Sequence, residues 1–167
     1  MSLKVITYTV DASDTLKMFD ELDFSKGEMK SALRRGLTKS VAILTRETKA
    51  QLSTVAYKRP LPNVPFLSKG ISVRVWRSAT GAVIGLFSKR NDIGFHGAKY
   101  KNPAFILRYI ERGTIARFTK KGGYYRGRME AKRFFQTAID LKMTEAATAL
   151  ENNIREAIMK VAERRRG

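Results

Sequence analysis

An apolar stripe between Met29 and Leu52 constrains the fold of this chain more than any other sequence feature. Its members recur every three or four residues, at Met29, Leu33, Leu37, Val41, Leu44, Thr48 and Leu52. Most of the intervening cationic side chains fall off that line, which is the pattern of an α-helix with one buried face. Ser25 and Glu28 stand in the positions of a capping box. The sequence therefore predicts a long amphipathic helix that ends near Ala56.

A second long helix is predicted at the end of the chain, where apolar residues again follow helical periods from Phe134 to Val161. It begins between Ala131 and Thr137 and reaches the basic tail at residues 164–167. We expect Phe134 and Phe135 to be split, with at least one of them in the core.

Strands are predicted where β-branched and apolar residues alternate or cluster. These segments are residues 2–9, 71–76, 82–88 and 104–110, with a turn at residues 79–81. Three prolines predict an extended loop over residues 57–68, and a glycine-rich polar loop is predicted over residues 89–103. The elements together predict an α+β fold in which an antiparallel sheet of about four strands packs with two long helices, plus a long basic loop.

The size and composition of the chain agree with a single domain over residues 1–167. There is no cysteine, which excludes disulfides and thiolate metal sites and suits synthesis in the cytoplasm. No segment approaches the roughly 18 unbroken apolar residues of a membrane span, so we expect no membrane partner.

The charge is strongly positive and unevenly distributed. The chain has 33 Lys and Arg against 15 Asp and Glu, a net charge of +18. Residues 1–25, a predicted strand followed by an acidic segment, hold five acids and two bases, which leaves 31 bases and ten acids for the rest. Such a field attracts polyanions, namely nucleic acid, an anionic membrane or an acidic protein.

The region from Glu111 to Arg133 is the most basic part of the chain. Glu111 and Glu130 are its only acids. Because glycines interrupt it and little apolar area can be buried, residues 114–130 are predicted to be a flexible basic arm. Its cations can neutralise phosphates while a tyrosine stacks on bases; alternatively, the arm orders against an acidic protein. The candidate contact residues are Arg112, Arg117, Lys120, Lys121, Tyr124, Tyr125, Arg126, Arg128, Lys132 and Arg133.

Signals for catalysis are weak. The only histidine, His96, lies in a predicted loop without a G-x-S-x-G elbow nearby. The acids are too sparse for a metal nuclease, and residues 120–123 do not match a P-loop. The sequence therefore predicts a protein that is not an enzyme and has no catalytic residues, metal or cofactor. A hydrolase that combines His96 with a distant serine is the enzymatic alternative.

The stretch Tyr109-Ile110-Glu111-Arg112-Gly113-Thr114 resembles the Tyr-x-Glu-x-Gly-Thr signature of the siphophage minor tail or tail-completion family. In that family the signature ends a strand, a variable insertion follows, and a short motif opens the final helix. Phe134 and Ala138 stand in the place of that motif, although its proline is absent because Arg133 directly precedes Phe134, and the insertion here is long and unusually basic. Residues 61–62 and 67–71 are similar to the family's proline loop and strand start, so the resemblance spans about residues 28–165.

The resemblance implies a structural role in a phage or prophage virion, assembled in the host cytoplasm. The resemblance implies a homo-oligomeric ring, commonly a hexamer, that joins the tail tube to the head connector proteins. In such a ring, one patch of a subunit meets a different patch on the next, and a basic lumen would give non-specific DNA contact. Glu111, Gly113 and Thr114 have a simpler physical interpretation as a structural turn. The alternative function is a non-enzymatic nucleic-acid-binding module that uses the basic arm.

Overall fold

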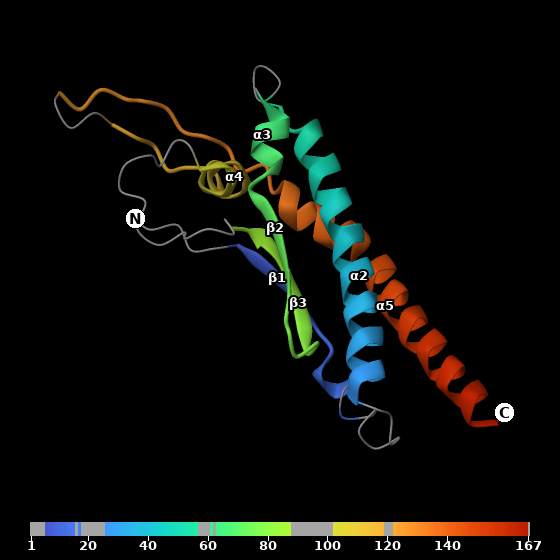
Figure 1. Cartoon of the computed structure of the whole chain (residues 1–167). Coiled ribbons are helices and arrows are strands. Elements are labelled where there is room, and N and C mark those ends of the chain that lie inside the picture. Colours follow the sequence, from blue (N-terminus) through green and yellow to red (C-terminus); the bar gives the residue numbers. More distant parts are fainter. Residues whose placement is uncertain are drawn as a thin grey trace. The chain divides into compact units, whose positions relative to one another are not determined.

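The computed structural model describes residues 6–15, 17, 26–56, 61, 63–87, 102–118 and 122–166 (Figure 1). Its architecture is α+β, a three-stranded antiparallel sheet accompanied by helices. In chain order the elements are β1 (Thr7–Asp11), α2 (Lys26–Thr54), α3 (Val64–Ser68), β2 (Ile71–Val75), β3 (Gly81–Leu86), α4 (Pro103–Arg112) and α5 (Phe134–Arg166). The predicted capping residue Ser25 and the loop histidine His96 lie outside the described residues.

The sheet has the strand order β1-β3-β2. Ala12 N donates to Thr80 O at 2.8 Å, and Leu86 N donates to Ile6 O at 2.8 Å, so β1 and β3 run in opposite directions. The predicted hairpin is present as β2 and β3. Its turn places Ala79 at φ 62°, a left-handed conformation that is uncommon for a residue with a side chain.

The chain divides into two compact units. The first unit contains residues 1–7, 47–72 and 85–140, and the second contains residues 8–46, 73–84 and 141–167. Both long helices contribute to both units, α2 up to Arg46 in the second and from Glu47 in the first. All seven members of the predicted apolar stripe are buried, which confirms the helical period.

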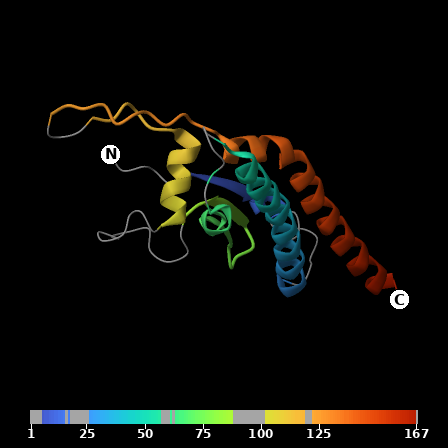
Figure 2. The ribbon, with the colours of Figure 1, turned by 90° about the horizontal axis from the view of Figure 1, so that it is seen from above.

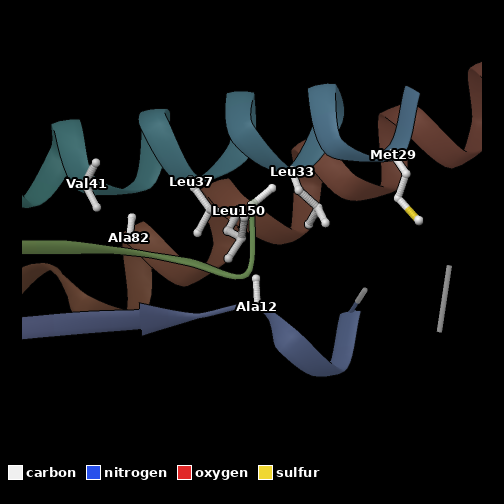
Figure 3. Packing of buried hydrophobic residues seen from close by; sticks show 8 residues of the cluster. Ala12, Met29, Leu33, Leu37, Val41, Ala82 and Leu150 are labelled. Atoms are coloured by element: carbon white, nitrogen blue, oxygen red, sulfur yellow. The ribbon is translucent and has the colours of Figure 1, made fainter. Parts of the chain in front are cut away.

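The core of the second unit is a cluster of apolar side chains between two helices and the hairpin (Figure 3). Leu33 and Leu37 from α2 are fully buried there and meet Leu150 from α5 and Ala82 from β3. Burying one leucine side chain stabilises a fold by about 1.5–3 kcal/mol relative to leaving it exposed. This cluster explains why α2 needs one continuous apolar face.

The core of the first unit is formed in part by the two short helices and the start of α5. Helices α3 and α4 pack together, and Gly70 lies against the backbone of Pro103 and Ala104 so closely that a Cβ would collide with it. Phe134 and Phe135 are both 2% exposed. The expectation that one phenylalanine lies in the core is confirmed, but the expected split is wrong because both are buried.

The predicted strand over residues 104–110 is wrong, because this segment is helix α4. Asn102 caps it by accepting a hydrogen bond from Ala104 N at 3.0 Å, and Pro103 occupies the first helical position. Proline is favourable there because its missing N–H has no partner in a first turn. A short apolar run fits a strand and a helix equally well, and the Asn-Pro pair decides between them. The described part of the sheet therefore has three strands where about four were expected.

A similar cap explains why the expected loop over residues 57–68 contains helix α3. Asn63 accepts a hydrogen bond from Phe66 N at 3.3 Å, and Pro65 lies within the first turn. A proline disrupts the interior of a helix but is tolerated at its start.

Candidate functional site: the basic arm and its clasp

The basic arm, residues 114–130, consists of two antiparallel limbs in the first unit (Figure 2). Arg117 N donates to Gly127 O at 3.2 Å, and Arg126 N donates to Arg117 O at 2.6 Å. Further out, Phe118 and Tyr125 form an antiparallel bridge, with ring centroids 5.6 Å apart. The predicted loop thus contains a backbone ladder in its described part. Thr119, Lys120 and Lys121 lie outside the described residues.

The arm is closed at its base by a set of contacts that we call the clasp, formed by Glu111, Gly113 and Thr114. Glu111 lies in the last turn of α4 and is 6% exposed. Its carboxylate oxygens accept from Phe135 N at 2.8 Å and from Gln136 N at 3.1 Å, in the first turn of α5. A carboxylate at this position satisfies N–H groups that lack partners in the helix and interacts favourably with the helix dipole.

Burial is the largest influence on the acidity of Glu111. It raises the pKa of the carboxyl above its ordinary value of 4.5, and the hydrogen bonds from Phe135 and Gln136 and the charges of Arg112 and Arg133 oppose that shift only in part. Burial disfavours the charged form. The clasp therefore contains a titratable group whose protonation affects the joint between α4 and α5.

Gly113 and Thr114 complete the clasp. Gly113 has φ 71° and ψ −169°, a combination essentially restricted to glycine. A Cβ there would lie 2.5 Å from Met129 O. Thr114 N donates to Met129 O at 2.8 Å, and Met129 N donates to Thr114 Oγ1 at 2.9 Å. Three of the four residues that define the signature, Glu111, Gly113 and Thr114, are accounted for by closing the base of the arm.

The surface of the arm combines exposed apolar groups with cations. Large exposed side chains along it are Ile115 (72%), Phe118 (61%), Tyr124 (73%) and Tyr125 (63%). A hollow of about 260 Å³ is lined by Arg117, Arg126, Gly127, Arg128 and Met129. Within the described residues, these three arginines have no carboxylate partner. The arrangement suits contact with another molecule through both apolar burial and charge.

The other residues that the sequence singled out lie around the base of the arm, in α4 and at the start of α5. Arg112 is exposed, and Lys132 lies 3.4 Å from Glu130. Arg133 adopts φ 46° just before α5, and its N–H donates to Glu111 O at 3.2 Å. Tyr109 packs its ring edge-on against Phe105, and Ala138 is fully buried with the two phenylalanines.

Sequence reasoning missed Arg108, which is 6% exposed and donates from Nε to Leu86 O at 2.9 Å. This bond ties α4 to the end of β3. A signal for it existed in the helical spacing of Ala104, Leu107, Arg108 and Glu111, which places all four on the buried face of α4.

No protein-family model, curated protein or solved structure matches this sequence. Among the described helices, none combines the length and apolarity needed to cross a membrane. The described residues also contain no group of three or more His, Cys, Asp and Glu side chains that could hold a metal ion.

One structural feature departs from the pattern of the siphophage family. The resemblance implied that the signature ends a strand, whereas here Tyr109 to Arg112 form the last turn of a helix.

Proposed function

We propose that this chain is a structural, non-enzymatic subunit of a phage or prophage tail-completion ring that joins the tail to the head. The observation that carries the proposal is the basic arm, a hairpin with four large exposed apolar side chains and a base fixed by the clasp. The resemblance of residues 109–114 and 134–138 to the tail-completion family supplies the kind of assembly.

The physical argument rests on where the apolar area of the arm is buried. A two-stranded hairpin is marginal by itself in water and cannot cover its own side chains. Phe118 and Tyr125 contact each other, yet both stay more than half exposed. Contact with a neighbouring subunit would remove this area from water, as apolar patches at interfaces do. Repetition of that contact by rotation closes a ring.

The test is the mass of the full chain in solution, by light scattering over a range of concentrations, with electron microscopy of any ring. We expect the wild type to assemble and the double variant Phe118→Ser, Tyr125→Ser to stay monomeric. The matched control is Leu141→Ser, Met159→Ser, which removes exposed apolar groups from α5 and should assemble normally. A wild type that remains monomeric throughout, or an arm variant that assembles like the wild type, contradicts the proposal.

The second candidate function is a nucleic-acid-binding module that uses the same arm. Arg117, Arg126 and Arg128 around one hollow, with Tyr124 and Tyr125 exposed nearby, favour phosphate contact combined with base stacking. This function would be favoured if the chain does not assemble and binds nucleic acid tightly and sequence-selectively. The variant Arg126→Gln, Arg128→Gln should then abolish that binding. Weak binding with a steep salt dependence fits a ring that merely surrounds DNA.

A further inference from the structure

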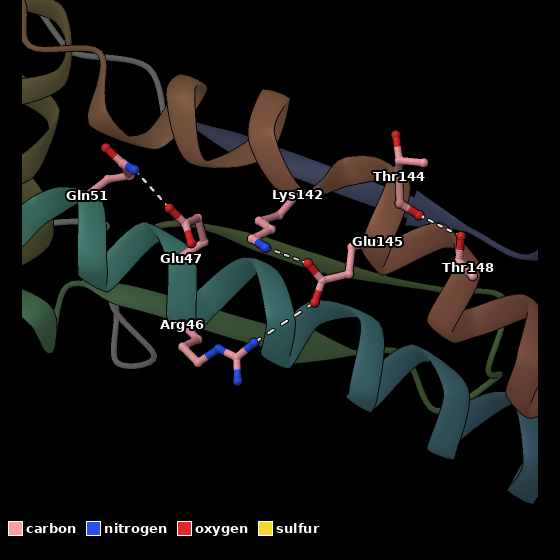
Figure 4. A network of polar contacts seen from close by, with 7 residues as sticks. All are labelled: Arg46, Glu47, Gln51, Lys142, Thr144, Glu145 and Thr148. Carbon is pink, nitrogen blue, oxygen red and sulfur yellow. Dashed lines mark hydrogen bonds and ion pairs between the residues drawn. The ribbon is translucent and has the colours of Figure 1, made fainter.

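In the second unit, α2 and α5 run antiparallel and are joined by ion pairs at two places. Glu28 Oε1 lies 2.7 Å from Arg164 Nη1. Glu145 lies 4.0 Å from Arg46 and 2.5 Å from Lys142, so it lies between two cations (Figure 4). Between these two places the helices come close at Gly36, where a Cβ would lie 2.8 Å from a methyl group of Leu150.

A basic groove lies between the same two helices. Its volume is about 510 Å³. The charged side chains that line it are Arg34, Arg35 and Lys39 from α2 and Glu156 and Lys160 from α5. Four cations and one acid give the groove a net charge of +3.

The four cations of the groove differ in their ion pairing from the cations at the two places where the helices are joined. In the part of the chain that the structure describes, Arg34, Arg35, Lys39 and Lys160 make no ion pair, whereas Arg46 and Arg164 do. Arg35 and Lys39 are four residues apart on one helix, a spacing at which like charges destabilise a helix. Stability alone gives no reason to gather these charges around one hollow, and a bound anion would remove the repulsion.

The charge balance of the chain indicates where that anion comes from. Every copy carries +18, so contacts between identical copies redistribute charge without neutralising it. This excess of positive charge attracts an external polyanion. Duplex DNA, with one negative charge per about 1.7 Å of helix axis, is the polyanion of high and regular charge density that suits cations on both walls of a groove.

We propose that the groove between α2 and α5 binds the phosphodiester backbone of a nucleic acid, through Arg34, Arg35, Lys39 and Lys160. Such contacts position a nucleic acid without reading its sequence. This site is separate from the basic arm, and it requires neither the proposed ring nor the alternative function of the arm.

The test measures binding of the full chain to a labelled, mixed-sequence DNA duplex by fluorescence anisotropy at several salt concentrations. The groove variant is Arg35→Gln, Lys39→Gln. The matched control is Arg74→Gln, Arg77→Gln, which removes two exposed cations of the hairpin region in the same unit. Because all four side chains are exposed, both variants should fold, and their melting temperatures check this. The assembly measurement described above is an independent readout.

We expect the slope of log K against log salt to become shallower by about 1.8 in the groove variant, since each phosphate contact contributes about 0.9. The control should keep the wild-type slope. Glu156→Gln removes the opposing charge and should tighten binding. Equal losses in the groove and control variants, or no loss in the groove variant, would overturn the proposal. Groove-dependent binding of poly-glutamate without binding of DNA would assign the groove to an acidic protein instead.

Discussion

The carboxylate of Glu111 accepts a hydrogen bond from the backbone N–H of Phe135 at 2.8 Å, which joins the last turn of α4 to the first turn of α5. The two residues are 24 positions apart, and the whole basic arm lies between them. The same carboxylate accepts from Gln136 N at 3.1 Å. Both ends of the arm are therefore held by one buried side chain.

Replacing Glu111 by Ala should lower the free energy of unfolding by about 2 kcal/mol. Hydrogen bonds to a charged group contribute about 1.5–3 kcal/mol, and a helix cap contributes about 1 kcal/mol. Chemical denaturation of the full chain measures this. Glu130→Ala is the control, since that carboxylate is 80% exposed and surface ion pairs contribute little. Equal stability of Glu111→Ala and the wild type would mean that the clasp does not hold the arm.

The pH dependence of stability should reveal the same group. Because burial raises the pKa of Glu111 in the folded state above 4.5, the folded state binds this proton more tightly than the unfolded state. The resulting stabilisation is complete below about pH 4.5 and is lost as the pH rises through the folded pKa. The stability of the wild type relative to Glu111→Gln should therefore fall across that window and level off above it. A relative stability that rises with pH would show that hydrogen bonding, and not burial, dominates.

Gly113→Ala should destabilise the protein by about 3 kcal/mol. Its backbone conformation costs a residue with a Cβ about 1–3 kcal/mol, and the new methyl group would also lie 2.5 Å from Met129 O. The comparison is Gly27→Ala in the first turn of α2, where a Cβ meets nothing within 4 Å. Alanine is the better helix former, so that variant should be neutral or slightly stabilised. Thermal melts of both variants would separate the two outcomes.

Phe134→Ala and Phe135→Ala should each cost about 3–5 kcal/mol, because both rings are 2% exposed and deletion of a buried ring leaves a cavity. If only one of the two rings were buried, as the sequence led us to expect, one variant would be strongly destabilised and the other only slightly. Denaturation of the two single variants distinguishes these cases, with Gln136→Ala on the exposed side of the same turn as a mild reference.

The sequence by itself determined the two long helices and the hairpin. The apolar stripe of α2 has a period that only a helix can place on one face, and each of its members is buried. The start of α5 and the positions of β2 and β3 follow from patterns equally local to the chain. Such patterns depend on the geometry of a single element, which is why they can be recognised without the rest of the fold.

Tertiary structure alone decided how the arm is closed and where charges gather. Glu111 and Phe135, or Thr114 and Met129, are distant in the chain, and no periodicity connects them. Arg35 and Lys160 likewise line one groove only because α2 and α5 pack in a particular antiparallel register. A short apolar segment such as residues 104–110 lies between these cases: its composition fits a strand or a helix, and the Asn102 cap together with burial against neighbouring elements selects the helix.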